Sequence, residues 1–453
     1  MQYSQPATID LLRLHELNPQ RYPYLLESVA HGTRHSRYDI LFAFPQHTLR
    51  LSADEILQGQ DEQADRGFLN AFEDWFQREK QEQMSDHDLP FHGGWFVYLA
   101  YELVREIEVD IDKGHQTDQH TIACAVRCPG AIIYDHQESR LICFVEDQYA
   151  DLMSVLKQDV LAVQVDTVKP EKPSSLLSDM VEEQPERYLH AVNTIKDYIV
   201  EGDVFQVNLS RLWKSRLKPD VSAADLYRNL RINNPAPFAG LAVLDDMTII
   251  CSSPERLVSV KNNMAETRPI AGTRPRSSSV AEDLRLSDEL MGHPKEQAEH
   301  IMLIDLERND LGRVCQPGTI LVDELMTLES FAHVHHIVSN VRGMLRPNIS
   351  PVDVIRAVFP GGTITGCPKV RCMQIIAELE QQPRGAYTGS MGYVNLDGSM
   401  DLNILIRTLL KSGNDVSLRA GAGIVYDSDP DNELNETRAK ARGLLRSLAV
   451  EGT

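Results

Sequence analysis

The chain is poor in cysteine and has no long apolar run. Its seven cysteines are odd in number and scattered, which suits a reduced compartment better than a disulfide framework. None has the spacing of a structural zinc site. No apolar run approaches the ~20 residues that a membrane span requires, and residues 1–18 lack a basic region followed by an apolar core. We therefore expect a cytoplasmic protein with no membrane contact.

Basic residues are also scarce. The chain has 45 Lys and Arg against 66 Asp and Glu, for a net charge of −21. Binding to nucleic acid needs a basic footprint, so nucleic acid is excluded as a partner. An anionic small molecule is still compatible with this charge, because arginines placed locally decide such binding.

One basic segment stands out against this acidic background, Pro269-Ile-Ala-Gly-Thr-Arg-Pro-Arg276. Its two prolines predict a rigid, irregular segment. Gly272 allows a close backbone approach to a ligand, and Thr273 offers a hydroxyl. Arg274 and Arg276 have forked donors that match a carboxylate. Taken alone, so short a segment favours an exposed basic turn.

A Lys-, Pro-, Ser- and Glu-rich stretch at 167–186 predicts a linker. We place an N-terminal region at 1–165 and a second region at 186–450. The second region opens with a helical pattern over 187–201 that ends at Gly202. The period then changes to two, which predicts a strand with Gln206 and Asn208 on one face.

Further elements are predicted along the second region. Residues 277–289 are polar and are expected to be irregular and mobile, whereas 295–314 has a helical pattern with Ile301, Ile304 and Leu311 toward the core. Strand alternation would send His335 and His336 to opposite faces, which disfavours a metal site there. Strands are expected at 392–396, 401–408 and 416–420, and a helix from residue 432.

The segment 359–369 is rich in glycine. It has the glycine spacing of a phosphate-binding loop, but Cys367 stands where that motif requires lysine. Nucleotide binding is therefore rejected. Successive amides in such a turn could still cradle a carboxylate.

Several motifs together resemble those of the chorismate-utilising enzymes, in the order of that family. They cover 185–448 densely and the N-terminal region weakly, and they are Gly202–Asn208, Ser253–Arg256, Pro269–Arg276, Glu299–Met302, Arg308–Gly312, Phe359–Lys369, Gly421–Gly423 and Glu436–Arg438. The resemblance implies an α+β fold of two antiparallel β-sheets packed together and flanked by helices, as in anthranilate synthase component I.

The resemblance also implies a substrate, a metal and an activity. The substrate would be chorismate, and Glu299 and Glu436 match ligands of Mg²⁺, a hard cation that prefers oxygen. Among family members, the chain is most similar to component I of aminodeoxychorismate synthases, which serve p-aminobenzoate and folate biosynthesis. Anthranilate synthases come second, and a non-catalytic amino-acid-binding paralogue is the third alternative.

Individual roles follow from the same resemblance. His336 matches a proton donor to the departing hydroxyl, and Glu255 matches an acid/base carboxylate. Gln206 stands where water-using relatives carry a lysine base, which favours an amine nucleophile. Ala271 stands where many aminodeoxychorismate synthases carry a nucleophilic lysine. The remaining substrate contacts implied are Gly272, Thr273, Lys369, Tyr387, Arg407, Gly421, Ala422 and Gly423.

Two further ligands are implied by the resemblance. Ammonia would come from a separate glutamine amidotransferase subunit, since no Gly-x-Cys-x-Gly nucleophile elbow occurs in this chain. A bound tryptophan, regulatory or structural, would occupy a pocket in which the N-terminal region takes part. Its residues would be Ser28, His35, Ser36, Arg37, Tyr38, Pro237, Phe238 and Ala239.

Overall fold

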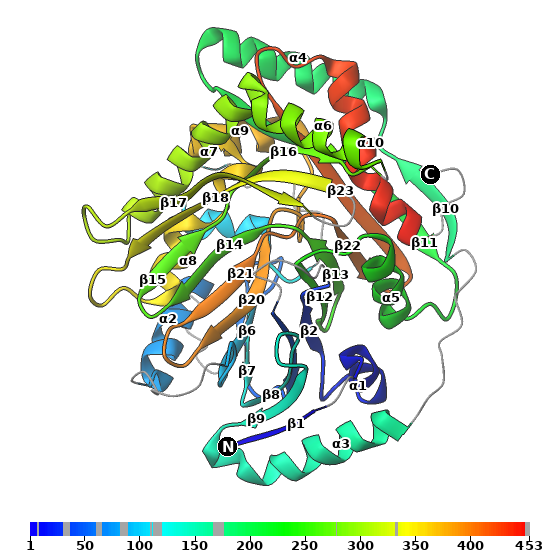
Figure 1. Ribbon diagram of the computed structural model, residues 1–453, viewed down its shortest axis with the longest axis vertical. Coiled ribbons are helices and arrows are strands. Elements are labelled where there is room, and N and C mark those ends of the chain that lie inside the picture. The colour runs from blue at the N-terminus through cyan, green and yellow to red at the C-terminus, as the bar shows by residue number, and fades with distance from the viewer. Residues whose placement is uncertain are drawn as a thin grey trace.

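Two large antiparallel sheets form the centre of the protein (Figure 1). The computed structural model describes residues 1–6, 9–29, 37–59, 66–81, 89–108, 111, 120–165, 176–277, 279–330 and 334–448. Within these ranges one sheet, sheet A, has 12 strands and the other, sheet B, has 11. The α+β fold with two packed antiparallel sheets is thus confirmed.

The strands of sheet A are, in spatial order, β1 (Gln2–Pro6), β9 (Arg140–Val145), β8 (Gly130–Asp135), β3 (Tyr38–Ala43), β2 (Tyr24–Glu27), β12 (Phe238–Val243), β13 (Thr248–Ser253), β22 (Thr408–Ser412), β23 (Asp415–Ile424), β11 (Gln206–Leu217) and β10 (Leu177–Glu182), with β19 (Gly366–Cys367) on the start of β11.

Those of sheet B are β16 (Ile270–Pro275), β18 (Val334–Met344), β15 (Met264–Thr267), β14 (Arg256–Lys261), β21 (Met400–Asn403), β20 (Ser390–Asn395), β6 (Gly94–Leu99), β7 (Ala123–Cys128), β4 (Thr48–Leu51) and β5 (Leu57–Gln58), with β17 (Leu321–Ser330) on β18.

Helices cover the outer faces of both sheets (Figure 1). They are α1 (Leu11–Leu17), α2 (Phe68–Glu79), α3 (Met153–Val165), α4 (Pro185–Glu201), α5 (Ala223–Asn233), α6 (Val280–Gly292), α7 (Pro294–Gly312), α8 (Pro351–Val358), α9 (Lys369–Glu380) and α10 (Pro430–Ser447), with short 3₁₀ helices at Tyr101–Glu106, Asp147–Leu152 and Gly362–Ile364. No helix in the described ranges combines the length and apolarity needed to cross a membrane.

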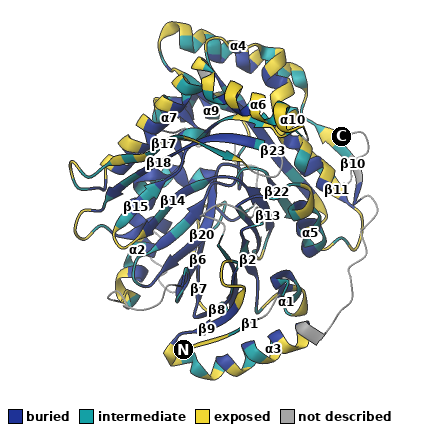
Figure 2. Ribbon diagram, viewed as in Figure 1, coloured by how far each residue is buried: buried dark blue, intermediate teal, exposed yellow. Residues whose placement is uncertain are grey.

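Three apolar layers hold the sheets and helices together. Phe42, Phe96 and Tyr393 belong to the layer between the sheets, and separate clusters lie beneath the helices on each outer face. Figure 2 shows the buried strands inside and the exposed residues concentrated on the outer sides of the helices. Burial of each large apolar side chain contributes about 1.5–3 kcal/mol, and this is the main term favouring the fold.

Both sheets take strands from both halves of the sequence. The N-terminal strand β2 pairs with β12, and β6 pairs with β20. The regions 1–165 and 186–450 therefore share the same cores. Of the expected linker at 167–186, residues 167–175 lie outside the described residues, whereas 177–182 form β10 of sheet A and are not a linker.

Candidate active site

The site is built where the chain crosses between the two sheets. One crossing joins β13 of sheet A to β14 of sheet B and carries Glu255. A second crossing joins β21 of sheet B to β22 of sheet A and carries Arg407. Backbone bonds tie the crossings together, because Ile404 N donates to Glu255 O at 3.0 Å and Ser252 N donates to Arg407 O at 3.1 Å.

Glu255 is a buried carboxyl with an altered acidity. Burial raises the pKa of Glu255 to about 7, although the Thr363 hydroxyl and the cations of Arg407 and Lys440 act in the opposite direction. Removing a carboxylate from water disfavours its charged form. A carboxyl with this pKa exists in both protonation states near neutral pH, as a general acid requires.

Arg407 is a half-buried cation in a strained backbone position. Its φ is +50°, in the left-handed region that non-glycine residues seldom adopt. Burial lowers the pKa of the guanidinium, and the nearby Glu255 raises it. No described residue forms an ion pair or side-chain hydrogen bond with it, so its forked donors are available to a carboxylate. The sequence had placed Arg407 inside a strand, and the structure places it in the link between β21 and β22.

His336 faces the basic segment across two paired strands. Thr273 of β16 lies opposite His336 of β18, and Thr273 Oγ1 is 3.0 Å from His336 Nδ1. Nδ1 also lies 3.3 Å from Gly272 O, so the same ring nitrogen faces a hydroxyl and a carbonyl oxygen that can only accept. Burial and Arg407 lower the pKa of His336 to about 4, so the ring is neutral at pH 7. His335 points the other way, toward Ser330 and Asp283, as strand alternation predicted.

The segment Pro269–Arg276 is an edge strand rather than the irregular turn that its prolines suggested. Residues 270–275 pair with β18, with a register shift at Gly272, whose φ is +60°. The prolines are tolerated because Pro269 precedes the strand and Pro275 ends it. Arg274 pairs with Glu289 and Glu296, and Arg276 pairs with Asp283 at 2.8 Å. These arginines therefore fasten α6 and α7 to the strand.

Two amides and two glycines meet on the inner face of sheet A. Gln206 and Asn208 project from the same face of β11, and their partner strand β23 carries Gly421 and Gly423. A Cβ on Gly421 would lie 2.7 Å from the Tyr387 hydroxyl oxygen and 2.8 Å from Asn208 Oδ1. Glycine therefore leaves room for these polar groups. The methyl of Ala422 belongs to the opposite face, in the apolar cluster that contains Leu209.

Replacing Gly423 by alanine tests this close approach. The new Cβ would lie 2.2 Å from Gln206 Nε2, so the glutamine side chain must move while the strands remain paired. We expect turnover to fall at least about tenfold, because small misplacements at a reacting centre are costly. The thermal midpoint should stay near that of the wild type. The matched control is Gly312→Ala, whose Cβ would meet its nearest neighbour at 3.9 Å. Full activity in Gly423→Ala would remove Gln206 from the site.

Glu299 and Glu436 come from helices on opposite sides of this arrangement. Glu299 lies on α7, which packs on β16 and β18, and Glu436 lies on α10, which packs on β23. Glu436 is half exposed and pairs with Lys440 at 2.8 Å. In the described residues no three His, Cys, Asp or Glu side chains converge as a metal site. A pair of carboxylates fits Mg²⁺, which takes its other ligands from water and substrate oxygens.

Lys369 is held in a buried acidic cluster. Its ammonium pairs with Asp310 at 2.5 Å, and both side chains are largely buried. Burial and the charge of Asp310 raise the pKa of Glu307 to about 8. Lys369 therefore neutralises negative charge on α7. Among the described contacts, none joins the Lys369 side chain to Gln206, Tyr387 or Arg407.

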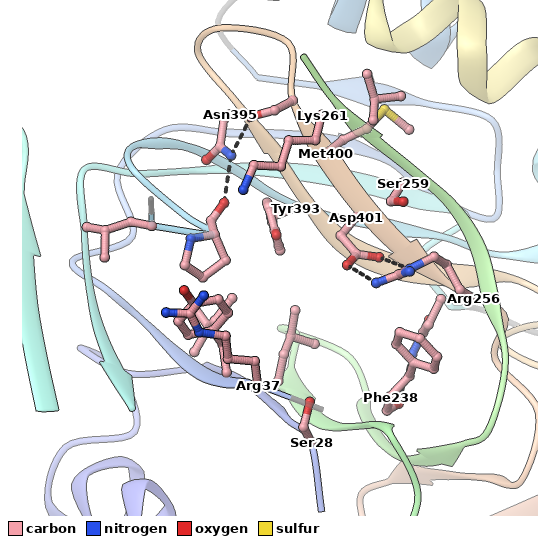
Figure 3. Close-up of a pocket in the computed structure, with 18 of the residues that line it drawn as sticks. Ser28, Arg37, Phe238, Arg256, Ser259, Lys261, Tyr393, Asn395, Met400 and Asp401 are labelled. Carbon is pink, nitrogen blue, oxygen red and sulfur yellow. Dashed lines mark hydrogen bonds and ion pairs between the residues drawn. The ribbon is translucent and has the colours of Figure 1, made fainter. Parts of the chain in front are cut away.

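Residues expected to bind tryptophan line a second cavity, of about 740 Å³, shown in Figure 3. Ser28, Arg37, Tyr38, Pro237, Phe238 and Ala239 all contribute to its wall, whereas His35 and Ser36 lie outside the described residues. Arg256 and Asp401 form a bidentate ion pair at one side of the cavity. The volume and the mixed apolar and polar lining suit a small organic ligand.

Two side chains at the site were missed from the sequence. Lys440 donates to Gly421 O at 3.0 Å and pairs with Glu436. Its position four residues after Glu436 on a helix was a usable signal. Arg384 donates to Asn208 O at 2.7 Å and to Ile364 O at 3.2 Å. No sequence pattern identified Arg384, because its partners are distant along the chain.

Comparisons with known proteins agree with this geometry. The family model of chorismate binding enzymes matches residues 23–446. An anthranilate synthase component I-like protein of Synechocystis is 44% identical, over 80% of this chain and 73% of its own. The aminodeoxychorismate synthase component 1 of Bacillus subtilis is 42% identical, over 84% of this chain and 82% of its own. The crystal structure of anthranilate synthase component I from Streptococcus pneumoniae superposes with a TM-score of 0.80 at 32% identity, over 91% of this chain and 93% of its own.

The fold and the site define an enzyme that uses chorismate. The chain belongs to the chorismate-binding enzyme family.

Proposed function

We propose that the protein is the aminating component of an aminodeoxychorismate synthase, which converts chorismate and ammonia to 4-amino-4-deoxychorismate. The observation that carries this proposal is the 42% identity to the component 1 of B. subtilis, which exceeds the 32% identity to the solved anthranilate synthase component I. Gln206 supports an amine nucleophile, because an amide cannot deprotonate water.

Arg407 and Tyr387 would hold one substrate carboxylate, and Lys440 would add a cation beside Gly421. His336 is neutral, and in the tautomer that carries the proton on Nε2 it would donate a hydrogen bond to the leaving hydroxyl without transferring the proton. Glu255, with a pKa of about 7, would supply that proton. Glu299 and Glu436 would hold Mg²⁺, which when bound neutralises negative charge on the substrate.

Ala271 determines the route of the amination. It lies in a small apolar cluster with Leu303 and Leu306, and it offers no nucleophile. Ammonia would therefore attack C4 directly. The C–N bond forms as the C4–O bond breaks, the hydroxyl leaves as water with the proton from Glu255, and the new ammonium group returns a proton to that carboxylate. Ammonia would come from a separate glutamine amidotransferase subunit.

The metal assignment can be tested by single replacements. We expect Glu299→Gln or Glu436→Gln to raise the Mg²⁺ concentration for half-maximal turnover about tenfold or more, because each removes a charged ligand. The matched control is Asp305→Asn, since Asp305 is an exposed carboxylate of α7 paired only with Arg308 among the described contacts. An unchanged Mg²⁺ dependence in either variant would remove that glutamate from the metal site.

The second cavity is proposed to bind tryptophan. Phe238, Met391 and Met400 give it apolar surface, while Arg37 and Lys261 bring positive charge. Calorimetry should detect saturable binding of L-tryptophan to the wild type. Phe238→Ala should weaken this binding at least about tenfold, because a buried aromatic contact is worth 1.5–3 kcal/mol. Equal affinity in the two proteins would place tryptophan elsewhere.

The product of the reaction tests the function itself. Purified protein is incubated with chorismate, Mg²⁺ and excess ammonium, and the products are separated and identified by mass. We expect 4-amino-4-deoxychorismate. Fluorescent anthranilate would instead support the second candidate, an anthranilate synthase, which the 44% identity to the Synechocystis protein and Ala271 favour. No turnover with an added amidotransferase would contradict both.

A further inference from the structure

A further cavity of about 910 Å³, here called the outer cavity, lies on the same face of sheet A as Gln206 and Asn208. Its floor is formed by neighbouring strands β22, β23, β11 and β10 (Figure 1). In the β11–β23 register, Leu212 pairs with Arg419, Lys214 with Ser417, and Arg216 with Asp415. Segment 381–387 forms another wall and includes Tyr387 and Arg384, so the outer cavity adjoins the substrate site and extends from it along the sheet.

Positive charge gathers in the outer cavity although the whole protein is acidic. Four cations line it in the described part of the chain, Lys214, Arg216, Arg384 and Arg419, and they face Asp415 at the rim and Glu380 behind the wall. Arg384 already donates two hydrogen bonds to the carboxylate of Glu380, from Nη2 at 2.7 Å and from Nε at 3.0 Å. Arg419 is thus a second buried guanidinium on a carboxylate that is already neutralised.

Arg419 leaves part of its hydrogen-bonding capacity unused. Its side chain is only 5% exposed, and Nη1 donates to Ser210 Oγ at 2.9 Å and to Glu380 Oε2 at 3.3 Å. Among the residues that the structure describes, none accepts a hydrogen bond from its Nε or Nη2. Neither nitrogen is among the buried side-chain atoms that have no partner, so water reaches both of them, and the Nε–Nη2 edge is the side that matches the two oxygens of a carboxylate.

We propose that the outer cavity is a binding site for a small carboxylate anion, held by the free edge of Arg419. Lys214 and Arg216 add positive charge that attracts the ligand toward the opening. Burial of the guanidinium reduces competition from water, which strengthens a charged hydrogen bond. This inference is independent of the reaction catalysed at the other site.

Binding of glutarate, measured by calorimetry and by thermal midpoint, tests the proposal, with sodium chloride at equal ionic strength as the reference. We expect saturable binding to the wild type, weakened at least about tenfold in Arg419→Gln, because a bidentate charge-assisted contact is lost. Arg407→Gln controls for glutarate in the substrate site and should leave this binding unchanged. The exposed Arg216 serves as the matched surface control, since Arg216→Gln should weaken binding much less.

Three results would overturn the proposal: no saturable binding to the wild type, equal binding to Arg419→Gln, or binding lost in Arg407→Gln. Should Arg419→Gln fail to fold, Arg419→Lys keeps a charge beside Glu380 but cannot present two parallel donors. Weaker binding to Arg419→Lys is then expected, and unchanged affinity would overturn the proposal. This experiment measures binding of glutarate and not turnover of chorismate. Its failure can therefore be distinguished from a failure of the proposed amination.

Discussion

Replacing Glu255 by glutamine is expected to lower kcat for chorismate about 10²- to 10⁴-fold, the contribution typical of a general acid. The amide keeps the size of the side chain but cannot give a proton to the leaving hydroxyl. The KM for chorismate should change little, because Arg407 and Tyr387 remain in place. Product formation at saturating ammonium measures the effect. The control is the exposed carboxylate Glu138, and Glu138→Gln should retain wild-type turnover.

The pH dependence gives a second test of Glu255. Its pKa of about 7 predicts that kcat of the wild type falls about tenfold per unit above pH 7, as the acid form disappears. The raised pKa of Glu255 also makes the free energy of unfolding depend on pH. Between pH 4.5 and 7 the folded chain keeps a proton that the unfolded chain loses, so stability falls as pH rises through this window. Glu255→Gln should flatten both profiles. A variant within threefold of wild-type kcat would exclude Glu255 as the acid.

Local periodicity was enough to predict the elements with one clear face. The helix predicted at 187–201 is α4, which ends at Gly202 with φ 86°. The strand after it is β11, with Gln206 and Asn208 on one face as expected. These predictions succeed because spacing of apolar residues and a left-handed glycine are properties of the local sequence.

Polar helices were harder to predict. Residues 277–289, expected to be irregular, belong largely to α6, where Asp283 binds Arg276 and His335. Partners outside the helix hold it, and they leave no periodic apolar pattern in its sequence. In α7, Ile304 and Leu311 are buried as predicted, but Ile301 is 46% exposed and His300 takes the inward position beside Ser339. The buried hydrogen bond between His300 and Ser339 explains why His300, and not Ile301, faces the core.

The components of the site could be named from the sequence only through resemblance, because its geometry depends on long-range contacts. Glu255 and Arg407 lie about 150 residues apart, as do the two crossings between the sheets that carry them. The pairing of Lys369 with Asp310, and the charge network around Glu380, have no local signature. Physical reasoning on sequence therefore found candidate residues, and the fold determined which of them meet.

Removing the charge of Glu380 should cause the largest loss of stability. Its side chain is 3% exposed and contacts Arg384, Arg419 and the Ser210 backbone N–H. These cations lower the pKa of Glu380 against the effect of its burial. Glu380→Gln would leave two guanidinium groups buried without a carboxylate. We expect the free energy of unfolding to fall by about 3–5 kcal/mol, as when one partner of a buried ion pair is removed.

Urea denaturation followed by tryptophan fluorescence measures this loss, with Glu378→Gln as the control. Glu378 lies two residues away and contacts only the exposed Tyr198 hydroxyl among the described side-chain hydrogen bonds, so its replacement should cost less than about 1 kcal/mol. The double variant Glu380→Gln/Arg419→Gln removes one of the unpaired cations. Because the two residues share one network, its loss should be smaller than the sum of the single losses. Additive losses would show that Glu380 does not balance the positive charge of Arg419. Another anion would then have to balance that charge in the folded protein.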